Sequence, residues 1–324
     1  MKNKLILPVF STYLFETTGH PFDVSMYKLI KTIKSDFDVS MYKLIKTIKS
    51  NASFLKYNPV KSVADPFLFV NNDSLFLFYE KQILMNNGTI EMTYTKDLIN
   101  WSAPITVLKH STHLSYPFVF EDYGNVFMIP ETYQKNNIQL YKANYDLTKW
   151  AFEKEILHGE NYVDTSIFIH DNVYYLFTTV ENNNVYQLHL FFADKLLGEF
   201  KKHPQSPIAI GDFIGRCGGS VFKLEDKIYR PVQIRENHYG ESLSIFQIKV
   251  LSPTDYQEEL EIEKFLSKPS ILNGHHFNFT KFNNKLIIAT DAVNVKFNFF
   301  QFYYRIINKV KKMIYRQKNT KIEK

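Results

Sequence analysis

Short apolar runs rich in phenylalanine and tyrosine alternate with polar turns along most of the chain. The clearest example is the run at residues 63–69, which is followed by a polar turn at 71–73 and by a second run at 75–80. Alternation with period two and enrichment in aromatic side chains are typical of β-strands, and Asn and Asp tolerate the left-handed backbone of a tight turn. This stretch therefore predicts a β-hairpin.

The hairpin pattern returns four more times, at intervals of about 50 residues. Alignment of the copies on their turns brings one position of each into a common register, namely Asp65, Tyr116, Asp164, Gly218 and His276. A long repeat built of short strands is typical of a β-propeller, in which each repeat forms one blade. We therefore predict an all-β protein, a five-bladed β-propeller. The alternative is a β-sandwich, which has turns every 8–12 residues or so but no long period.

The repeats divide the chain into three parts. Residues 63–297 form the predicted propeller, preceded by an N-terminal part at 1–62 and followed by a basic tail at 298–324. The last repeat is short, and the apolar run at 5–15 is predicted to supply the strand that completes its blade. The alternative for this run is a signal peptide. It would be a poor one, because Pro8 interrupts the apolar run and no small-residue cleavage site follows directly.

The N-terminal part contains a tandem duplication, since residues 22–35 recur identically at 37–50. Met26, Leu29 and Ile33 lie at helical spacing, so each copy is predicted to form a short amphipathic helix. The pair is either a surface insertion or a helical hairpin for a partner.

The basic tail is predicted to form a short C-terminal amphipathic helix over residues 298–317. Its apolar residues fall on one helical face, and its Lys and Arg residues fall on the others. Such a helix either docks on the propeller or lies on an anionic membrane surface.

Composition narrows the classes of partner and compartment. The formal net charge is +6, but no nucleic-acid-binding motif is present, so we expect no nucleic acid partner. Cys217 is the only cysteine, which excludes an intrachain disulfide and fits a reducing compartment. We expect a cytoplasmic protein, peripheral to the membrane if the tail binds lipid. No cofactor and no metal are expected, because His275 and His276 are adjacent and face opposite ways along a strand.

Propeller geometry gathers distant residues into one candidate site. The inner strand of each blade lines the central channel, and antiparallel pairing places the start of one strand beside the end of the next. The residues of the common register should therefore lie near a second set, which is Glu80, Glu131, Thr179, Gln233 and Asp291. Arg216 and Arg230 flank the members from the fourth repeat.

Clustered carboxylates with nearby aromatic and arginine side chains suit the binding and cleavage of sugars. Cleavage of a glycosidic bond needs one protonated carboxyl for the leaving oxygen and one ionised carboxylate as base or nucleophile. We assign Asp65 as base or nucleophile, Glu131 as general acid and Asp164 as the group that orients them. The predicted substrate-binding residues are Tyr116, Arg216, Arg230, Gln233, His276, Glu80 and Asp291. Alternatively, Asp65 and Asp164 only accept hydrogen bonds from backbone amides at strand starts.

Several motifs resemble a known family, the N-terminal propeller domain of glucosamine inositolphosphorylceramide transferases. They are the segments at 63–67, 113–118, 129–132, 164–168 and 229–233. The resemblance covers roughly residues 55–292, and we expect no glycosyltransferase domain of the kind that follows in the plant transferase, because this chain leaves no room for one. More distantly, Ala64-Asp65-Pro66 is similar to the first-blade motif of five-bladed furanosidase-type glycoside hydrolases. That similarity implies a base or nucleophile role for Asp65, although Tyr116 stands where that clan has a second Asp.

Two functions follow from these observations. The first is a carbohydrate-active protein, glycosidase-like or glycosyl-transferring, that processes a sugar, glycan or glycolipid substrate in surface polysaccharide biosynthesis. The alternative is a non-catalytic glycan-binding or scaffold propeller that assists a glycosyltransferase, with Tyr116 stacking on sugar faces. Turnover of a glycan by the wild-type protein would distinguish them.

Overall fold

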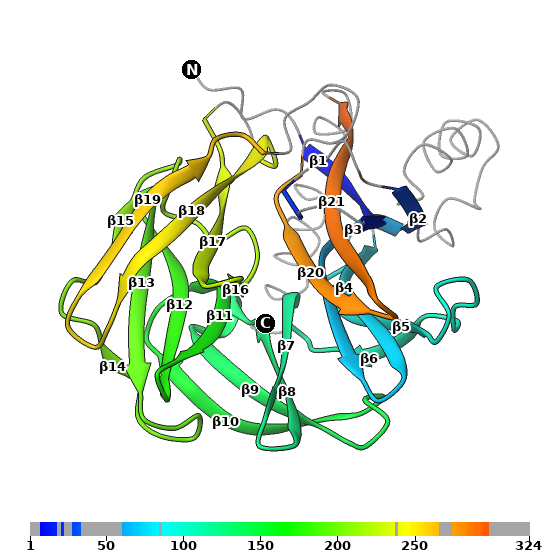
Figure 1. The fold of residues 1–324 in the computed structure, drawn as a ribbon, viewed down its shortest axis with the longest axis horizontal. Helices are drawn as coiled ribbons and strands as arrows, with labels where there is room; N and C mark the ends of the chain where they lie inside the picture. Colours follow the sequence, from blue (N-terminus) through cyan, green and yellow to red (C-terminus); the bar gives the residue numbers. More distant parts are fainter. Residues whose placement is uncertain are drawn as a thin grey trace, which may run out of the picture.

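A computed structural model describes residues 7–17, 21–22, 28–33, 60–83, 86–236, 239–265 and 274–297. The chain forms five antiparallel sheets arranged around a central axis (Figure 1). This arrangement confirms the predicted all-β, five-bladed β-propeller.

Blades one to four follow one another along the chain, each running from an inner to an outer strand. Blade one contains β3 (Val60–Asn71), β4 (Ser74–Ile83), β5 (Gly88–Thr95) and β6 (Ile105–Leu108). Blade two contains β7 (Ser115–Asp122), β8 (Asn125–Glu131), β9 (Asn137–Ala143) and β10 (Trp150–His158). Blade three contains β11 (Tyr162–His170), β12 (Val173–Asn182), β13 (Val185–Ala193), β14 (Lys201–Lys202) and β15 (Ala209–Ile210). Blade four contains β16 (Phe222–Leu224), β17 (Lys227–Ile234), β18 (Ser242–Leu251) and β19 (Tyr256–Ile262).

Blade five joins the two ends of the fold. It has the order β2-β1-β21-β20, with β20 (Phe277–Phe282) innermost and β21 (Lys285–Phe297) next to it. The N-terminal strand β1 (Leu7–Thr17) pairs antiparallel with β21 from one end to the other (Figure 1). The predicted closing strand is therefore confirmed.

The predicted helix in the first duplicated copy is wrong where the structure describes it. Residues Lys28–Ile33 form β2, which pairs with β1 at the outer edge of blade five. Thr32 and Ile33 are β-branched, and pairing with the preceding strand β1 outweighs the weak helical spacing of a short segment. The second copy at 37–50 and the predicted helix at 298–317 lie outside the described residues. Within the described part of the chain, no helix is long and apolar enough to cross a membrane.

Two repeated turns carry the chain from the third to the fourth strand of blades one and two. Asp97 Oδ1 accepts hydrogen bonds from the backbone N–H groups of Ile99 and Asn100, and Asp146 Oδ1 accepts one from Thr148. The blades then pack face to face through apolar clusters, one of which joins blades two and three. This packing fixes the inner strands around the axis, where the candidate site lies.

Candidate functional site

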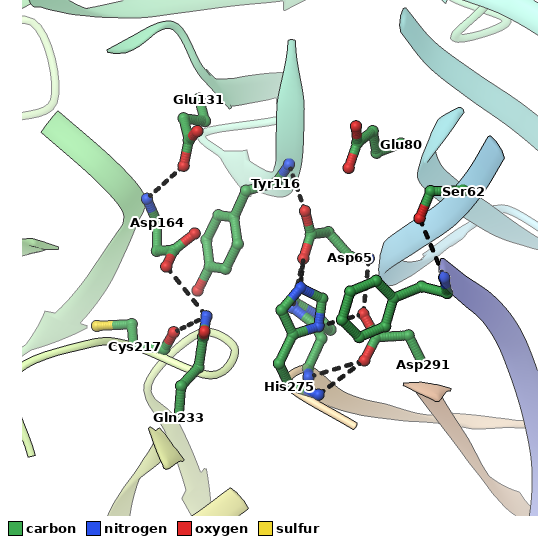
Figure 2. Close-up of polar contacts among 12 residues, drawn as sticks. Ser62, Asp65, Glu80, Tyr116, Glu131, Asp164, Cys217, Gln233, His275 and Asp291 are labelled. Atoms are coloured by element: carbon green, nitrogen blue, oxygen red, sulfur yellow. Dashed lines mark hydrogen bonds and ion pairs between the residues drawn. The ribbon is translucent and has the colours of Figure 1, made fainter. Parts of the chain in front are cut away.

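The inner strands of blades one, two and three share a distortion at the positions that the repeats align. The strand register shifts between Ala64 and Phe67, between Ser115 and Phe118, and between Val163 and Ser166. One residue in each bulge has a left-handed backbone conformation. These residues are Asp65 (φ 52°), Tyr116 (φ 43°) and Asp164 (φ 52°). Bulges re-aim side chains, and a left-handed conformation at such residues is costly. The shared distortion brings these three side chains together in one cluster (Figure 2).

Carboxylates of one blade accept hydrogen bonds from the bulge of the next blade. Asp291 Oδ2 accepts the Asp65 N–H at 3.1 Å, and Asp65 Oδ2 accepts the Tyr116 N–H at 3.3 Å. Likewise, Glu131 Oε2 accepts the Asp164 N–H at 3.2 Å (Figure 2). Asp65 and Asp164 of the first predicted set are therefore in direct contact with Asp291 and Glu131 of the second.

Asp164 is held by two side chains from blade four and the loop before it. Its Oδ2 atom accepts hydrogen bonds from Arg216 Nε and from Gln233 Nε2, the latter at 3.1 Å. Gln233 Nε2 also donates to the carbonyl oxygen of Cys217 at 2.7 Å. The Arg216 guanidinium in turn contacts the rings of Tyr186 and Tyr239. Asp164 thus links blade three to blade four.

His275 is a residue of the site that the sequence did not identify. Its Nδ1 atom lies 2.7 Å from Asp291 Oδ2, and its Nε2 atom lies 3.7 Å from Asp65 Oδ1. Its ring stacks on Phe10 of the closing strand, with the ring centroids 4.1 Å apart. Burial opposes the charged form, but the Asp291 carboxylate outweighs it and raises the pKa of His275 to about 9. His275 is therefore a cation between two carboxyl groups.

His276, which was predicted to bind substrate, is instead fully buried beside the channel. Its ring packs edge-on against Phe67 and Tyr116, and its exposed fraction is 0%. Burial lowers the pKa of His276 to about 3, so its imidazole is neutral. The adjacency of the two histidines was the only signal in the sequence that His275 faces the carboxylates.

Burial also changes the protonation of two of the three predicted catalytic carboxyls. Desolvation raises the pKa of Asp65 to about 8, and His275 opposes that increase. Desolvation likewise raises the pKa of Glu131 to about 8, and the charge of Asp164 adds to the increase. Both groups are therefore largely protonated at neutral pH.

An open cavity of about 650 Å³, which we call the inner cavity, lies over the second and third blades at this end of the channel. Glu131 and Arg216 form part of its wall, together with Tyr133, Asn161, Val163, Glu181, Asn183 and Asn184. Tyr133 belongs to a short 3-10 turn, η3 (Tyr133–Lys135), that follows β8. The inner cavity therefore gives a ligand direct access to a protonated carboxyl and a guanidinium.

Two of the predicted substrate-binding residues face other partners. Arg230 is fully buried, and its guanidinium makes two hydrogen bonds to the carboxylate of Glu258. Its side chain faces away from Asp164, which Gln233 contacts, because Arg230 and Gln233 are three residues apart on β17 and face opposite sides of the sheet. Glu80 lies 3.2 Å from His113 Nε2 at the junction of blades one and two.

Asp65, His275 and Asp291 are the group of described residues that could hold a metal ion, with one potential ligand atom from each within 4.8 Å of the others. His275 must be neutral to bind a metal. A cation would therefore have to displace the proton that His275 holds between the same two carboxyl groups.

The protonation of this site makes stability sensitive to alkaline pH. Raising the pH from 6.5 to 9 is expected to lower the melting temperature. The folded state retains protons on Asp65 and Glu131 up to about pH 8 and on His275 up to about pH 9, whereas the unfolded chain releases them at lower pH. Differential scanning fluorimetry at the two pH values measures the decrease.

In the Glu131→Gln variant the melting temperature should fall less between pH 6.5 and 9. The substitution removes one of the three titrating groups from both the folded and the unfolded chain. Glu153→Gln is the matched control, since Glu153 is exposed on β10. An identical pH dependence of wild type and Glu131→Gln would contradict the assigned protonation of Glu131.

Comparisons with known proteins first define the class of fold. A family 117 glycoside hydrolase of the marine bacterium Zobellia galactanivorans is similar with a TM-score of 0.53 and 11% identity, over 73% of this chain and 87% of that one. The GH43 protein BlXynB of Bacillus licheniformis is similar with a TM-score of 0.52 and 12% identity, over 79% and 56% of the two chains. These similarities extend to the fold, which is a β-propeller.

Sequence comparison then gives the family. The family described as "Glucosamine inositolphosphorylceramide transferase 1, N-terminal" matches residues 29–321, and the chain belongs to it. Glucosamine inositolphosphorylceramide transferase 1 of Oryza sativa subsp. japonica is 32% identical over 190 residues, which are 54% of this chain and 25% of that protein. The protein of the same name from Arabidopsis thaliana is 33% identical over 193 residues. The matched region spans about a quarter of the length of these relatives. The chain is thus a carbohydrate-related propeller of this family.

Proposed function

We propose that the chain processes a glycan or glycolipid in surface polysaccharide biosynthesis, with the reaction at the end of the channel that holds Asp65, Glu131 and Asp164. The observation that carries the proposal is that Glu131 keeps its proton near neutral pH and also lines the inner cavity. A carboxyl that is both protonated and accessible to ligand has the property required of a general acid.

In the proposed reaction, Glu131 donates its proton to the oxygen that leaves the anomeric carbon as the glycosidic bond breaks. Asp65, once ionised, takes the proton of the attacking group or attacks the anomeric carbon itself. The attacking group is water in hydrolysis or a sugar hydroxyl in transfer. His275 supports this role of Asp65, because a cation 3.7 Å away stabilises the ionised carboxylate.

Asp164 and Arg216 are proposed to position the substrate and the acid. The Arg216 guanidinium lines the inner cavity while its Nε donates to Asp164. Its remaining N–H groups suit an anionic or hydroxylated group of the ligand. Asp164 holds Glu131 through its backbone N–H.

A non-catalytic glycan-binding propeller is the second candidate, and one observation favours it. Asp65 and Asp164 accept hydrogen bonds from Tyr116, Arg216 and Gln233 within the protein, which ties neighbouring blades together. Carboxylates occupied in this way would stabilise the site, and the inner cavity would bind sugar without cleaving it.

The proposal is tested by Asp65→Asn and Glu131→Gln. If the pair performs acid–base chemistry, each change lowers turnover at least about a hundredfold, the scale of general acid–base catalysis, while the fold survives. The measurement incubates wild type and both variants with cell-surface glycan and glycolipid pools and follows the products by mass spectrometry. Asp73→Asn is the matched control, because Asp73 is exposed in the turn between β3 and β4.

The outcomes separate the two candidates. If wild type alters none of the pools but binds one of them, the enzymatic proposal is rejected in favour of the binding propeller. If Asp65→Asn keeps full turnover while Glu131→Gln loses it, the assignment of Asp65 as base or nucleophile is rejected.

A further inference from the structure

A second cavity, which we call the outer cavity, lies in the seam between blades two and three. Its volume is about 710 Å³, and His158 at the end of β10 faces strands β11, β12 and β13 across it. The outer cavity adjoins the inner cavity, because Glu181 lines both. A ligand could therefore extend from the catalytic end of the channel into the seam.

The wall of the outer cavity has polar side chains where a blade seam is otherwise apolar. Phe191 and Ala193 of β13 belong to the buried core between blades two and three. Gln187 and His189 continue the same face of β13, because side chains at alternate positions point to one side of a strand. Both are only half-buried and line the outer cavity. Polar side chains at core-facing positions require polar partners, and the protein supplies one of them, because Ser206 Oγ lies 3.3 Å from Nδ1 of His189.

The charges around the outer cavity favour an uncharged ligand. Burial lowers the pKa of His189 to about 4, so its imidazole is neutral and offers a hydrogen bond without charge. The rim carries two carboxylates, Glu160 and Glu181, against one ammonium group, Lys202, so its excess charge is negative and disfavours an anionic ligand. A neutral hydroxylated ligand matches this wall better than a phosphate or carboxylate does.

We propose that the outer cavity is a subsite for uncharged sugar residues of an extended glycan whose end occupies the inner cavity. This inference rests on the proposed function and adds the substrate class, an oligosaccharide chain in place of a single sugar. Either cavity alone has the volume of a small-molecule site, about 300–1,000 Å³, so two adjoining cavities are more than one monosaccharide needs.

The test measures how affinity depends on chain length. Full-length protein carrying Glu131→Gln, which suppresses turnover, is titrated by calorimetry with arabino-, xylo-, galacto- and gluco-oligosaccharides of one to six residues. In at least one series, affinity should rise about tenfold or more between the disaccharide and the tetrasaccharide, which is 1.4 kcal/mol.

Substitutions in the wall of the outer cavity then show whether the gain in affinity with chain length arises there. Gln187→Ala and His189→Ala, each added to Glu131→Gln, should weaken tetrasaccharide binding about tenfold and leave disaccharide binding unchanged. Lys202→Ala tests the rim, and Lys201→Ala is its matched control, because Lys201 is the adjacent residue of β14 and does not line the outer cavity. Melting temperatures confirm that every variant is folded.

Length-independent affinity in every series, or binding by none of them, overturns the inference. So does a tetrasaccharide gain that survives both wall substitutions. The proposed function is judged separately by the turnover of wild type. If binding depends on chain length but wild type shows no turnover, the enzymatic proposal is rejected and the subsite is retained. If wild type shows turnover but binding does not depend on chain length, the subsite is rejected and the enzymatic proposal is retained.

Discussion

Deleting residues 1–17 is expected to abolish the cooperative unfolding transition of the propeller. The deletion removes β1, which is the only described partner of β21 on its outer side and which also carries β2. Phe10, Leu14 and Phe15 of this strand are buried. Their burial stabilises the fold by roughly 5–9 kcal/mol at about 1.5–3 kcal/mol per side chain, as much as the whole stability of many domains.

Circular dichroism during heating measures this effect. Adding a synthetic peptide of residues 5–17 to the deleted protein should restore the transition, because the peptide can pair with β21. A peptide of the same composition in scrambled order is the control, since it lacks the pattern that buries Leu14. A deleted protein that melts cooperatively at the wild-type temperature would show that closure by β1 is dispensable.

Glu258→Gln is expected to destabilise the protein by about 3–5 kcal/mol, the cost of leaving a buried charge without its partner. The Arg230 side chain is 0% exposed and donates to both carboxylate oxygens of Glu258, from Nε at 2.8 Å and from Nη2 at 2.5 Å. Glutamine retains one acceptor and presents an amide N–H to the other donor. The loss is measured by urea unfolding.

Glu259→Gln is the matched control for this substitution. Glu259 is the neighbouring residue of β19, and its ion pair with Lys249 is exposed, so its loss should cost no more than about 1 kcal/mol. The double variant Arg230→Met, Glu258→Leu should recover much of the stability, because apolar side chains of similar volume replace buried pairs well. Equal losses for Glu258→Gln and Glu259→Gln would contradict the assigned burial of Arg230.

The sequence could predict the blades and their register because those features are local. Every repeat contains the same hairpin of its two inner strands, so alignment on the turns equals alignment around the axis. This is why Asp65, Tyr116 and Asp164 were grouped correctly, with the same left-handed backbone. Closure by the run at 5–15 was predictable from the short last repeat.

The errors arose where a partner outside the segment decides its structure. A segment as short as Lys28–Ile33 matches both helical and strand spacing, and only pairing with β1 selects the strand. The ion pair of Arg230 with Glu258 joins residues 28 positions apart in the sequence. The orientation of Arg230 itself was within reach, because an odd spacing from Gln233 along one strand places the two side chains on opposite faces. The choice between His275 and His276 depends on contacts with Asp65 and Asp291 that sequence spacing does not reveal.

Closure of blade five also sets the order of events during synthesis. Thr12 pairs with Asp291, so the first strand leaves the ribosome about 280 residues before its partner. At about 5–20 residues per second this delay is roughly 15–60 s. Blades one to four can assemble during that time, while β1 waits with an unpaired edge that could pair with another chain. Closure of blade five therefore waits for the arrival of β21, and we expect the N-terminal strand of the nascent chain to need protection until then.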